Sequence, residues 1–162
     1  MEIPYYLKNV WENKDPEVRE EIIRFWLSEK VLPEEQARQR VNQVFLIARD
    51  TVDNIVGINT VYKQYNKQLE NFFYYYRTYV TPRARKFQMT AEMMLEVKDY
   101  LEDRYIDKID TEVIGMFLQV ENETIKKKLN LAVWPGINFV YIGKNQRGDH
   151  LRVYYFKNAL LT

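Results

Sequence analysis

The chain contains no cysteine and a single histidine among its 162 residues. Without cysteine there is no disulfide framework, and no thiolate can serve as a metal ligand or as a nucleophile. One histidine without a cluster of carboxylates provides no metal site either. The sequence therefore predicts a protein that has neither a metal centre nor cysteine chemistry.

Long hydrophobic runs and an excess of one charge are also missing. Charged residues interrupt every apolar stretch, so no membrane span is predicted. The N-terminal residues Met-Glu-Ile-Pro-Tyr-Tyr lack the basic start and apolar stretch of a secretory signal, which makes the cytoplasm the expected compartment. The 24 lysines and arginines nearly balance the 23 acidic residues, which argues against a protein that coats nucleic acid or an anionic membrane.

The length suits a single domain over residues 1–162. Asp15 followed by Pro16 is a typical helix start, with Asp15 as the N-cap and Pro16 at the first helical position. A second helix follows Pro33, and residues 63–71 are expected to form a polar loop. Hydrophobic spacing predicts two further helices over residues 88–104 and 123–131, and strands over residues 3–10, 44–49, 55–62, 72–80, 113–120, 138–144 and 151–157. This order indicates a mixed α/β layout on one sheet.

The sheet should be built around a hairpin and an aromatic strand. Strands 44–49 and 55–62 are expected to pair as an antiparallel hairpin, which continues into strand 72–80. Alternate residues of a strand face opposite sides of the sheet. One set of side chains should pack under helix 88–104, and the other should line the opposite face of the sheet. The two sets are Phe72, Tyr74, Tyr76, Thr78 and Val80, and Phe73, Tyr75, Arg77 and Tyr79.

Three stretches in this order resemble the GNAT N-acetyltransferases. In the hairpin, Leu46-Ile-Ala-Arg-Asp50 is followed by Ile55-Val-Gly57. The segment from Val80 to Thr90, with Pro82 and Arg85, aligns without gaps on the family's V-x-P-x-x-R-x-x-G-x-G/A loop. The third stretch, Leu118-Gln-Val-Glu-Asn122, resembles the strand and Asn that open the next helix. The likeness covers roughly residues 5–130 and implies a mixed, mostly antiparallel sheet flanked by helices.

The resemblance implies acetyl-coenzyme A as a substrate, with its pyrophosphate at the start of helix 88–104, where unpaired amides and the helix dipole favour an anion. Gln88 and Thr90 stand where the family has glycine, which lets the backbone approach the phosphates closely. The Gln88 side chain would therefore either crowd the pyrophosphate or hydrogen-bond it. The implied cofactor-binding residues are Tyr79, Val80, Arg85, Lys86, Phe87, Gln88, Met89, Thr90 and Asn122.

Catalytic candidates are few. Tyr76 lies where the family often places its base, and it would either position a water molecule or pack in the core, because a tyrosine with an ordinary pKa near 10 is a poor base. The family's acid is a tyrosine in the last helix, and residues 123–131 contain none. Tyr141, on the following strand, is the alternative acid, or else a packing residue with its hydroxyl in water.

Two further groups are predicted to face solvent. His150 is expected in the turn of the last hairpin. The run Lys126–Lys128 should form a solvated helix face, and a contact with the 3′-phosphate of coenzyme A is its functional alternative.

Three functions from different classes remain open. The first is transfer of an acetyl group from acetyl-coenzyme A to an amine, by direct attack in a ternary complex. The acceptor is left open among a small amine, a peptide N-terminus and a lysine side chain. The second is a non-catalytic scaffold that binds a protein or peptide through the aromatic strand. The third is a single-strand nucleic-acid binder with Tyr74–Tyr76 as stacking platforms, against which the neutral charge argues. Homo-oligomerisation is left open.

Overall fold

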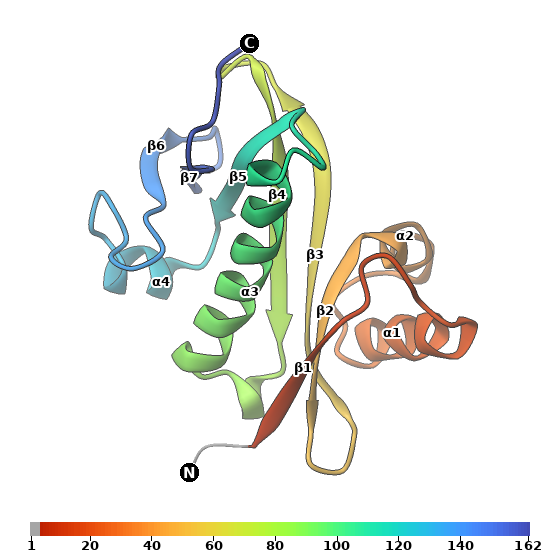
Figure 1. The fold of residues 1–162 in the computed structure, drawn as a ribbon. Helices are drawn as coiled ribbons and strands as arrows, with labels where there is room; N and C mark the ends of the chain where they lie inside the picture. The colour runs from red at the N-terminus through yellow and green to blue at the C-terminus, as the bar shows by residue number, and fades with distance from the viewer. Residues whose placement is uncertain (1–3) are drawn as a thin grey trace. The chain divides into compact units, whose positions relative to one another are not determined.

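The computed structural model describes residues 4–162, apart from the side chain of Phe87. The order of helices and strands is the predicted one (Figure 1). The strands are β1 (Tyr5–Asn9), β2 (Val44–Asp50), β3 (Ile55–Asn66), β4 (Asn71–Val80), β5 (Val113–Val120), β6 (Val140–Lys144) and β7 (His150–Tyr155). The α-helices are α1 (Pro16–Ser28), α2 (Glu34–Arg40), α3 (Phe87–Ile106) and α4 (Glu123–Lys128), and two short 3₁₀ turns are η1 (Val41–Gln43) and η2 (Pro82–Ala84).

The seven strands follow the order β1-β2-β3-β4-β5-β7-β6. Pairs β1–β2, β2–β3, β5–β7 and β6–β7 are antiparallel, whereas β4–β5 is parallel. The predicted mixed, mostly antiparallel sheet and its hairpin are therefore confirmed. Within residues 4–162, no helix combines the length and apolar character that crossing a membrane requires.

Contacts divide the chain into two compact units. The first unit contains the described residues up to Val61 together with Thr78–Val97, and the second contains Tyr62–Arg77 and Lys98–Thr162. Strands β3 and β4 and helix α3 contribute residues to both units. The single domain predicted over residues 1–162 stays a prediction.

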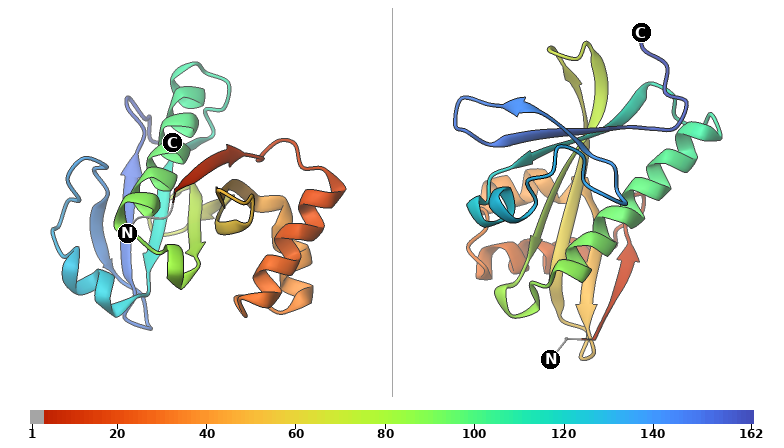
Figure 2. Two further views of the ribbon diagram at one scale, coloured as in Figure 1. Left: turned by 90° about the horizontal axis from the view of Figure 1, so that it is seen from below. Right: turned by 90° about the vertical axis from the view of Figure 1, so that its left-hand side faces the viewer.

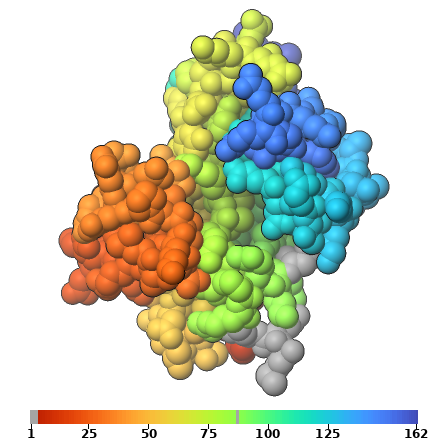
Figure 3. Space-filling view, turned by 180° about the vertical axis from the view of Figure 1, so that it is seen from behind, coloured from red at the N-terminus to blue at the C-terminus, as the bar shows by residue number. Residues whose placement is uncertain are grey.

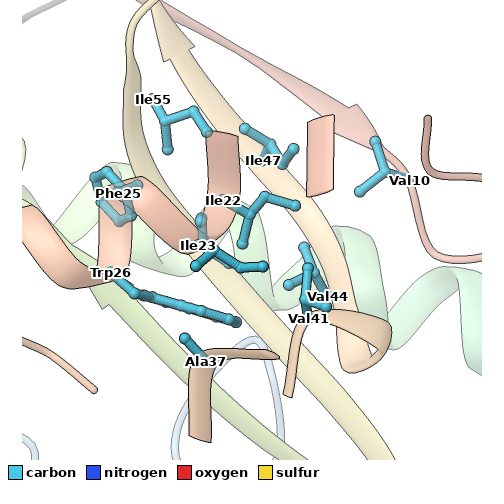
Figure 4. Close-up of a cluster of buried hydrophobic side chains, with 11 residues drawn as sticks. Val10, Ile22, Ile23, Phe25, Trp26, Ala37, Val41, Val44, Ile47 and Ile55 are labelled. Carbon is cyan, nitrogen blue, oxygen red and sulfur yellow. The ribbon is translucent and has the colours of Figure 1, made fainter. Parts of the chain in front are cut away.

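The core of the first unit lies between the α1–α2 pair and the β2–β3 hairpin. Helix α1 repeats apolar residues at helical spacing, so Ile22 and Trp26 point to the same side, and both are almost fully buried (Figure 4). Every residue of β2 is buried. Burial of this kind stabilises a fold by about 25 cal/mol per Å² of apolar surface.

The first half of α3 packs on the opposite face of the same hairpin. Figure 2 shows α1 and α2 on one side of β2 and β3 and the start of α3 on the other. The Asn59 side chain of β3 donates a 3.5 Å hydrogen bond to the carbonyl of Met93 in α3. Asn59 also accepts 2.8 Å from the Leu46 amide, so one buried amide ties strand β2 and helix α3 to strand β3.

In the second unit, aromatic rings join β4, β7 and the second half of α3. The ring of Phe156 lies 6.5 Å from Tyr74 and 5.7 Å from Tyr105 of α3. The Tyr154 hydroxyl donates to Glu102 of the same helix. The prediction that one side of β4 packs under the long helix is therefore confirmed, and Tyr74 lies on that side.

Several predicted boundaries are wrong. The loop predicted over residues 63–71 is only a turn at residues 67–70, because β3 runs on to Asn66 and β4 begins at Asn71. Aromatic pairs across the two strands stabilise this extension: Tyr65 meets Phe72 edge to face at 5.3 Å. Helix α4 ends at Lys128 instead of residue 131, and strand β6 begins at Val140 instead of 138.

The predicted N-cap is only half confirmed. Asp15 holds the cap position with Pro16 at the first helical position, but its side chain makes no capping hydrogen bond.

Two predicted solvent positions are also corrected. Lys126 is buried, and its ammonium donates 2.8 Å to Glu123 and 2.9 Å to the carbonyl of Gly148. His150 is half-buried at the first position of β7, and its ring meets Tyr141 edge to face at 5.2 Å. The Gly148 carbonyl lies 22 residues along the chain from Lys126, and Tyr141 lies on the strand paired with His150. Hydrophobic periodicity reveals neither contact.

Lys14 makes the stability of the first unit sensitive to pH. Its ammonium donates to the carbonyls of Trp11 (3.0 Å) and Asn42 (3.3 Å). Burial, with a smaller contribution from Arg19, lowers its pKa to about 8. The folded protein therefore releases this proton at a lower pH than the unfolded chain does. Below about pH 8 the buried charge destabilises the folded state fully, and this cost fades as the pH rises towards the unfolded pKa of 10.5.

We expect urea unfolding to show a gain in stability from this group between about pH 8 and about pH 10.5. Lys14→Met should lose that gain, because methionine has no proton to release. Arg38→Met, on an exposed side chain of α2, is the control and should keep the wild-type dependence. Identical pH dependence in wild type and Lys14→Met would contradict the assignment.

Candidate functional site

The segment between β4 and α3 lies within the first unit and forms a short, defined loop. The Thr81 amide donates 2.8 Å to the carbonyl of Val56, which fixes the end of β4 beside β3. Turn η2 follows, and α3 begins at Phe87. The Thr90 amide donates 3.3 Å to the Lys86 carbonyl. The backbone amides at 88 and 89 precede this bond, and helix geometry directs such amides out of the helix end, where the dipole is positive.

The Gln88 side chain does not cover these amides. Its Nε2 donates 3.1 Å to Glu92, one turn further along α3. Glu92 also accepts from the Tyr5 hydroxyl, and these two donors lower the pKa of its carboxyl group, Tyr5 first. Glutamine therefore lies along the helix surface here, so the loop keeps an anion-accepting end without the glycine.

The side chains of Arg85 and Tyr79 brace the loop from within. Nε and Nη2 of Arg85 donate to the carbonyl of Val80 at 3.2 and 2.9 Å. The guanidinium also lies over the Tyr79 ring, 5.6 Å from its centre. Both contacts hold the loop against the end of β4, while Arg85 and the neighbouring Lys86 are exposed.

The remaining predicted residues of this loop have unequal access to solvent. Met89 is 1% exposed, so its side chain packs in the core and is not a ligand-binding group. The Thr90 hydroxyl donates 3.3 Å to the Lys86 carbonyl. The Phe87 side chain lies outside the described part of the structure. Val80 is buried and packs beside Gly57 of β3: a Cβ added to Gly57 would lie 3.2 Å from the Cγ2 of Val80.

Tyr79 faces α1. Its ring lies 6.1 Å from that of Phe25, and its hydroxyl donates 3.3 Å to Glu29. Burial, followed by the charge of Glu29, raises the pKa of Tyr79. At neutral pH this tyrosine is therefore a hydrogen-bond donor and not a base.

Tyr76 and Asn122 belong to the second unit. The parallel pairing of β4 and β5 runs from Phe72 to Tyr76, which pairs with Leu118, although β5 continues to Val120. Tyr76 thus marks the last pair between these strands, and it is 5% exposed. Asn122 caps α4, because its Oδ1 accepts from the amides of Thr124 (2.9 Å) and Ile125 (3.2 Å).

Solved structures with this arrangement span nearly the whole chain. A GNAT-family acetyltransferase from Streptococcus pneumoniae matches with a TM-score of 0.66 at 12% identity, covering 95% of this chain and 100% of the other. This is the GNAT acetyltransferase fold. The ribosomal-protein-S5-alanine acetyltransferase of Vibrio fischeri matches at 0.61 and 12% identity, covering 97% and 96% of the two chains.

Arabidopsis thaliana NAA60 in complex with acetyl-CoA matches at 0.57 and 15% identity, covering 94% of this chain and 98% of that one. No protein-family model matches the sequence, and no curated protein matches it either. The GNAT fold is thus recognised from coordinates, with sequence identity of only 10–16% to these structures.

Sequence reasoning missed a charged cluster beside the loop. Asp50 ends β2, is buried, and accepts from the amides of Val52 (3.1 Å) and Asn54 (2.9 Å). Arg83 of η2 donates 3.2 Å to the same carboxylate. The Asn54 amide is the first of the contacts that lower the pKa of Asp50. The signal for it was present, since an Asp before a Thr-Val-Asp-Asn turn is typical of a side chain that caps its own turn.

Proposed function

We propose that this chain transfers an acetyl group from acetyl-coenzyme A to an amine. The observation that carries the proposal is the start of α3, where the backbone amides at 88 and 89 precede the first helical bond and the Gln88 side chain turns away to Glu92. A helix start of this kind favours binding of an anion such as a diphosphate. The GNAT fold supports the proposal, because NAA60 of the same fold is found with acetyl-CoA.

In this proposal the amides at the start of α3 bind the pyrophosphate, and the exposed side chains of Arg85 and Lys86 supply positive charge beside it. Bound acetyl-coenzyme A supplies an activated acyl group. The protein must orient it and accept a proton from the attacking amine. Tyr76, at the last β4–β5 pair, is proposed to position that amine or a water molecule beside it through its hydroxyl group.

The Gln88 position tests the cofactor site directly. Since its side chain already lies away from the helix end, Gln88→Gly should leave coenzyme A affinity unchanged or raise it, at a helix cost of about 1 kcal/mol or less. Gln88→Glu keeps the shape but adds a negative charge at the helix start, and it should weaken binding about tenfold. Calorimetric titration of coenzyme A into the three proteins measures both effects.

Arg38→Gln, on exposed α2, is the matched control and should bind like the wild type. Equal affinity of wild type and Gln88→Glu would place the coenzyme elsewhere. No heat from any of the proteins at millimolar coenzyme A would leave the non-catalytic scaffold as the better account of this fold.

A further inference from the structure

A hollow of about 360 Å³ lies in the first unit between α1, the β2–β3 turn and the end of β4. Figure 3 shows the surface of α1, in orange, beside the green segment that follows β4. The volume falls within the range of small-molecule sites, which is about 300–1,000 Å³. Phe25 and Ile55 supply apolar surface, and the rest of the lining is polar or charged.

The charged groups of the hollow leave an excess of hydrogen-bond donors. Glu21 lines it, but both of its oxygens accept from the guanidinium of Arg49 at 2.8 and 2.7 Å. Arg83 uses one Nη on Asp50 and lines the hollow, and because its side chain is 54% exposed, a ligand can reach its other donors. Arg24 lines the hollow from the exposed side of α1.

A buried hydroxyl in the same lining has no partner. Thr81 is 7% exposed, and its Oγ1 makes no hydrogen bond in the described structure. An unpaired buried hydroxyl costs free energy. Because Thr81 lines the hollow, rotation about its Cα–Cβ bond exchanges methyl and hydroxyl and offers the hydroxyl to a ligand.

We propose that this hollow binds a small molecule through a carboxylate or phosphate group. Arg24 and Arg83 would provide the charge-assisted hydrogen bonds, and Thr81 would add a neutral donor. Glu29, which accepts from the Tyr79 hydroxyl through one oxygen only, opposes a bare anion and favours a ligand that also carries an amine or hydroxyl group. The proposal does not depend on acetyl transfer.

The test is an NMR titration of the intact protein with inorganic phosphate and, separately, with malonate. We expect saturable shifts of the Ser28 and Asn54 amides, two backbone reporters in the lining. Arg24→Gln should weaken binding at least about tenfold, equivalent to about 1.4 kcal/mol. Glu29→Gln should strengthen it, because a repelling charge is removed, and Arg38→Gln on α2 should change nothing.

Thr81→Val adds a readout that a general charge effect does not produce. It removes the unpaired hydroxyl, so the ligand-free protein should melt at a higher temperature while its affinity for the anion falls. The proposal is overturned if neither probe produces saturable shifts. It is also overturned if Arg24→Gln and Glu29→Gln leave the anion affinity unchanged.

Two further arms identify the source of the ligand. Saturating coenzyme A that displaces phosphate from these amides would show that the hollow holds a phosphate of the coenzyme. Phosphate or malonate that binds alongside coenzyme A would show a separate ligand. Shifts at Ser28 and Asn54 without any coenzyme A binding would support the hollow while removing the proposed acetyl transfer.

Discussion

Replacing Gly115 by alanine will destabilise the protein by about 4 kcal/mol or more, or prevent the second unit from folding. A Cβ at this position would lie 2.1 Å from the backbone carbonyl oxygen of Tyr154 and 3.1 Å from the Cα of Tyr155. Both atoms belong to β7, which pairs with β5 at this point. Backbone atoms of a paired strand cannot move away without breaking the ladder, so the clash cannot be relieved locally.

Gly57→Ala is the matched control, since it also adds one methyl group to a strand glycine. There the nearest atom, 3.2 Å away, is the Cγ2 of the Val80 side chain, and a side chain can shift by a few tenths of an ångström. We expect a change within about 1 kcal/mol, because alanine also restricts the unfolded chain. Urea unfolding of both variants measures the contrast, and similar losses at the two positions would contradict the close approach at Gly115.

Arg152→Met will cost about 3 kcal/mol or more through the carbonyl oxygens that it leaves unsatisfied. Arg152 is 1% exposed. Its guanidinium donates 2.8 Å to the Leu131 carbonyl, with longer bonds to the carbonyls of Leu129, Ala132 and Phe139. Burial removes water from the guanidinium and thereby lowers the pKa of Arg152. The four carbonyl oxygens replace the hydrogen bonds that water would otherwise accept from this cation.

The same guanidinium stacks on the ring of Trp134, 4.2 Å from its centre. The indole Nε1 of Trp134 in turn donates 2.8 Å to the Leu129 carbonyl. Arg152 therefore organises the whole connection between α4 and β6.

Hydrogen exchange should show this connection losing protection first in Arg152→Met. Arg38→Met, with a side chain 50% exposed that pairs with exposed glutamates, is the control and should change stability by less than about 1 kcal/mol. If both variants unfold at the same urea concentration, the buried arginine is not the organising residue.

The strands and helices could be predicted because their signals are local. A run of aromatic and β-branched residues indicates β4, Pro16 indicates the start of α1, and the helical spacing of Met89, Met93 and Val97 indicates α3. The element order therefore follows from the sequence alone. The GNAT likeness added the expected sheet, which the structure bears out at low sequence identity.

The contacts that set the details could not be predicted, because each joins residues distant in sequence. Gly115 is indistinguishable in sequence from any strand glycine until Tyr154 is placed beside it. Lys126 stands in a basic run, yet it turns inward to the Gly148 carbonyl. At the candidate site, the resemblance named the loop from Arg85 to Thr90, but the direction of the Gln88 side chain depends on Glu92 and is seen only in the structure.

The measurement that tests the central claim most directly is an NMR titration of this protein with acetyl-coenzyme A, following the amides at the start of α3. We predict that the amides of Gln88, Met89 and Thr90 shift and saturate together, since hydrogen bonds from this helix end hold the pyrophosphate. Gln88→Glu should require about tenfold more ligand for the same shifts. Amides at 88–90 that stay unmoved at millimolar acetyl-coenzyme A would contradict the claim that this fold uses the coenzyme here.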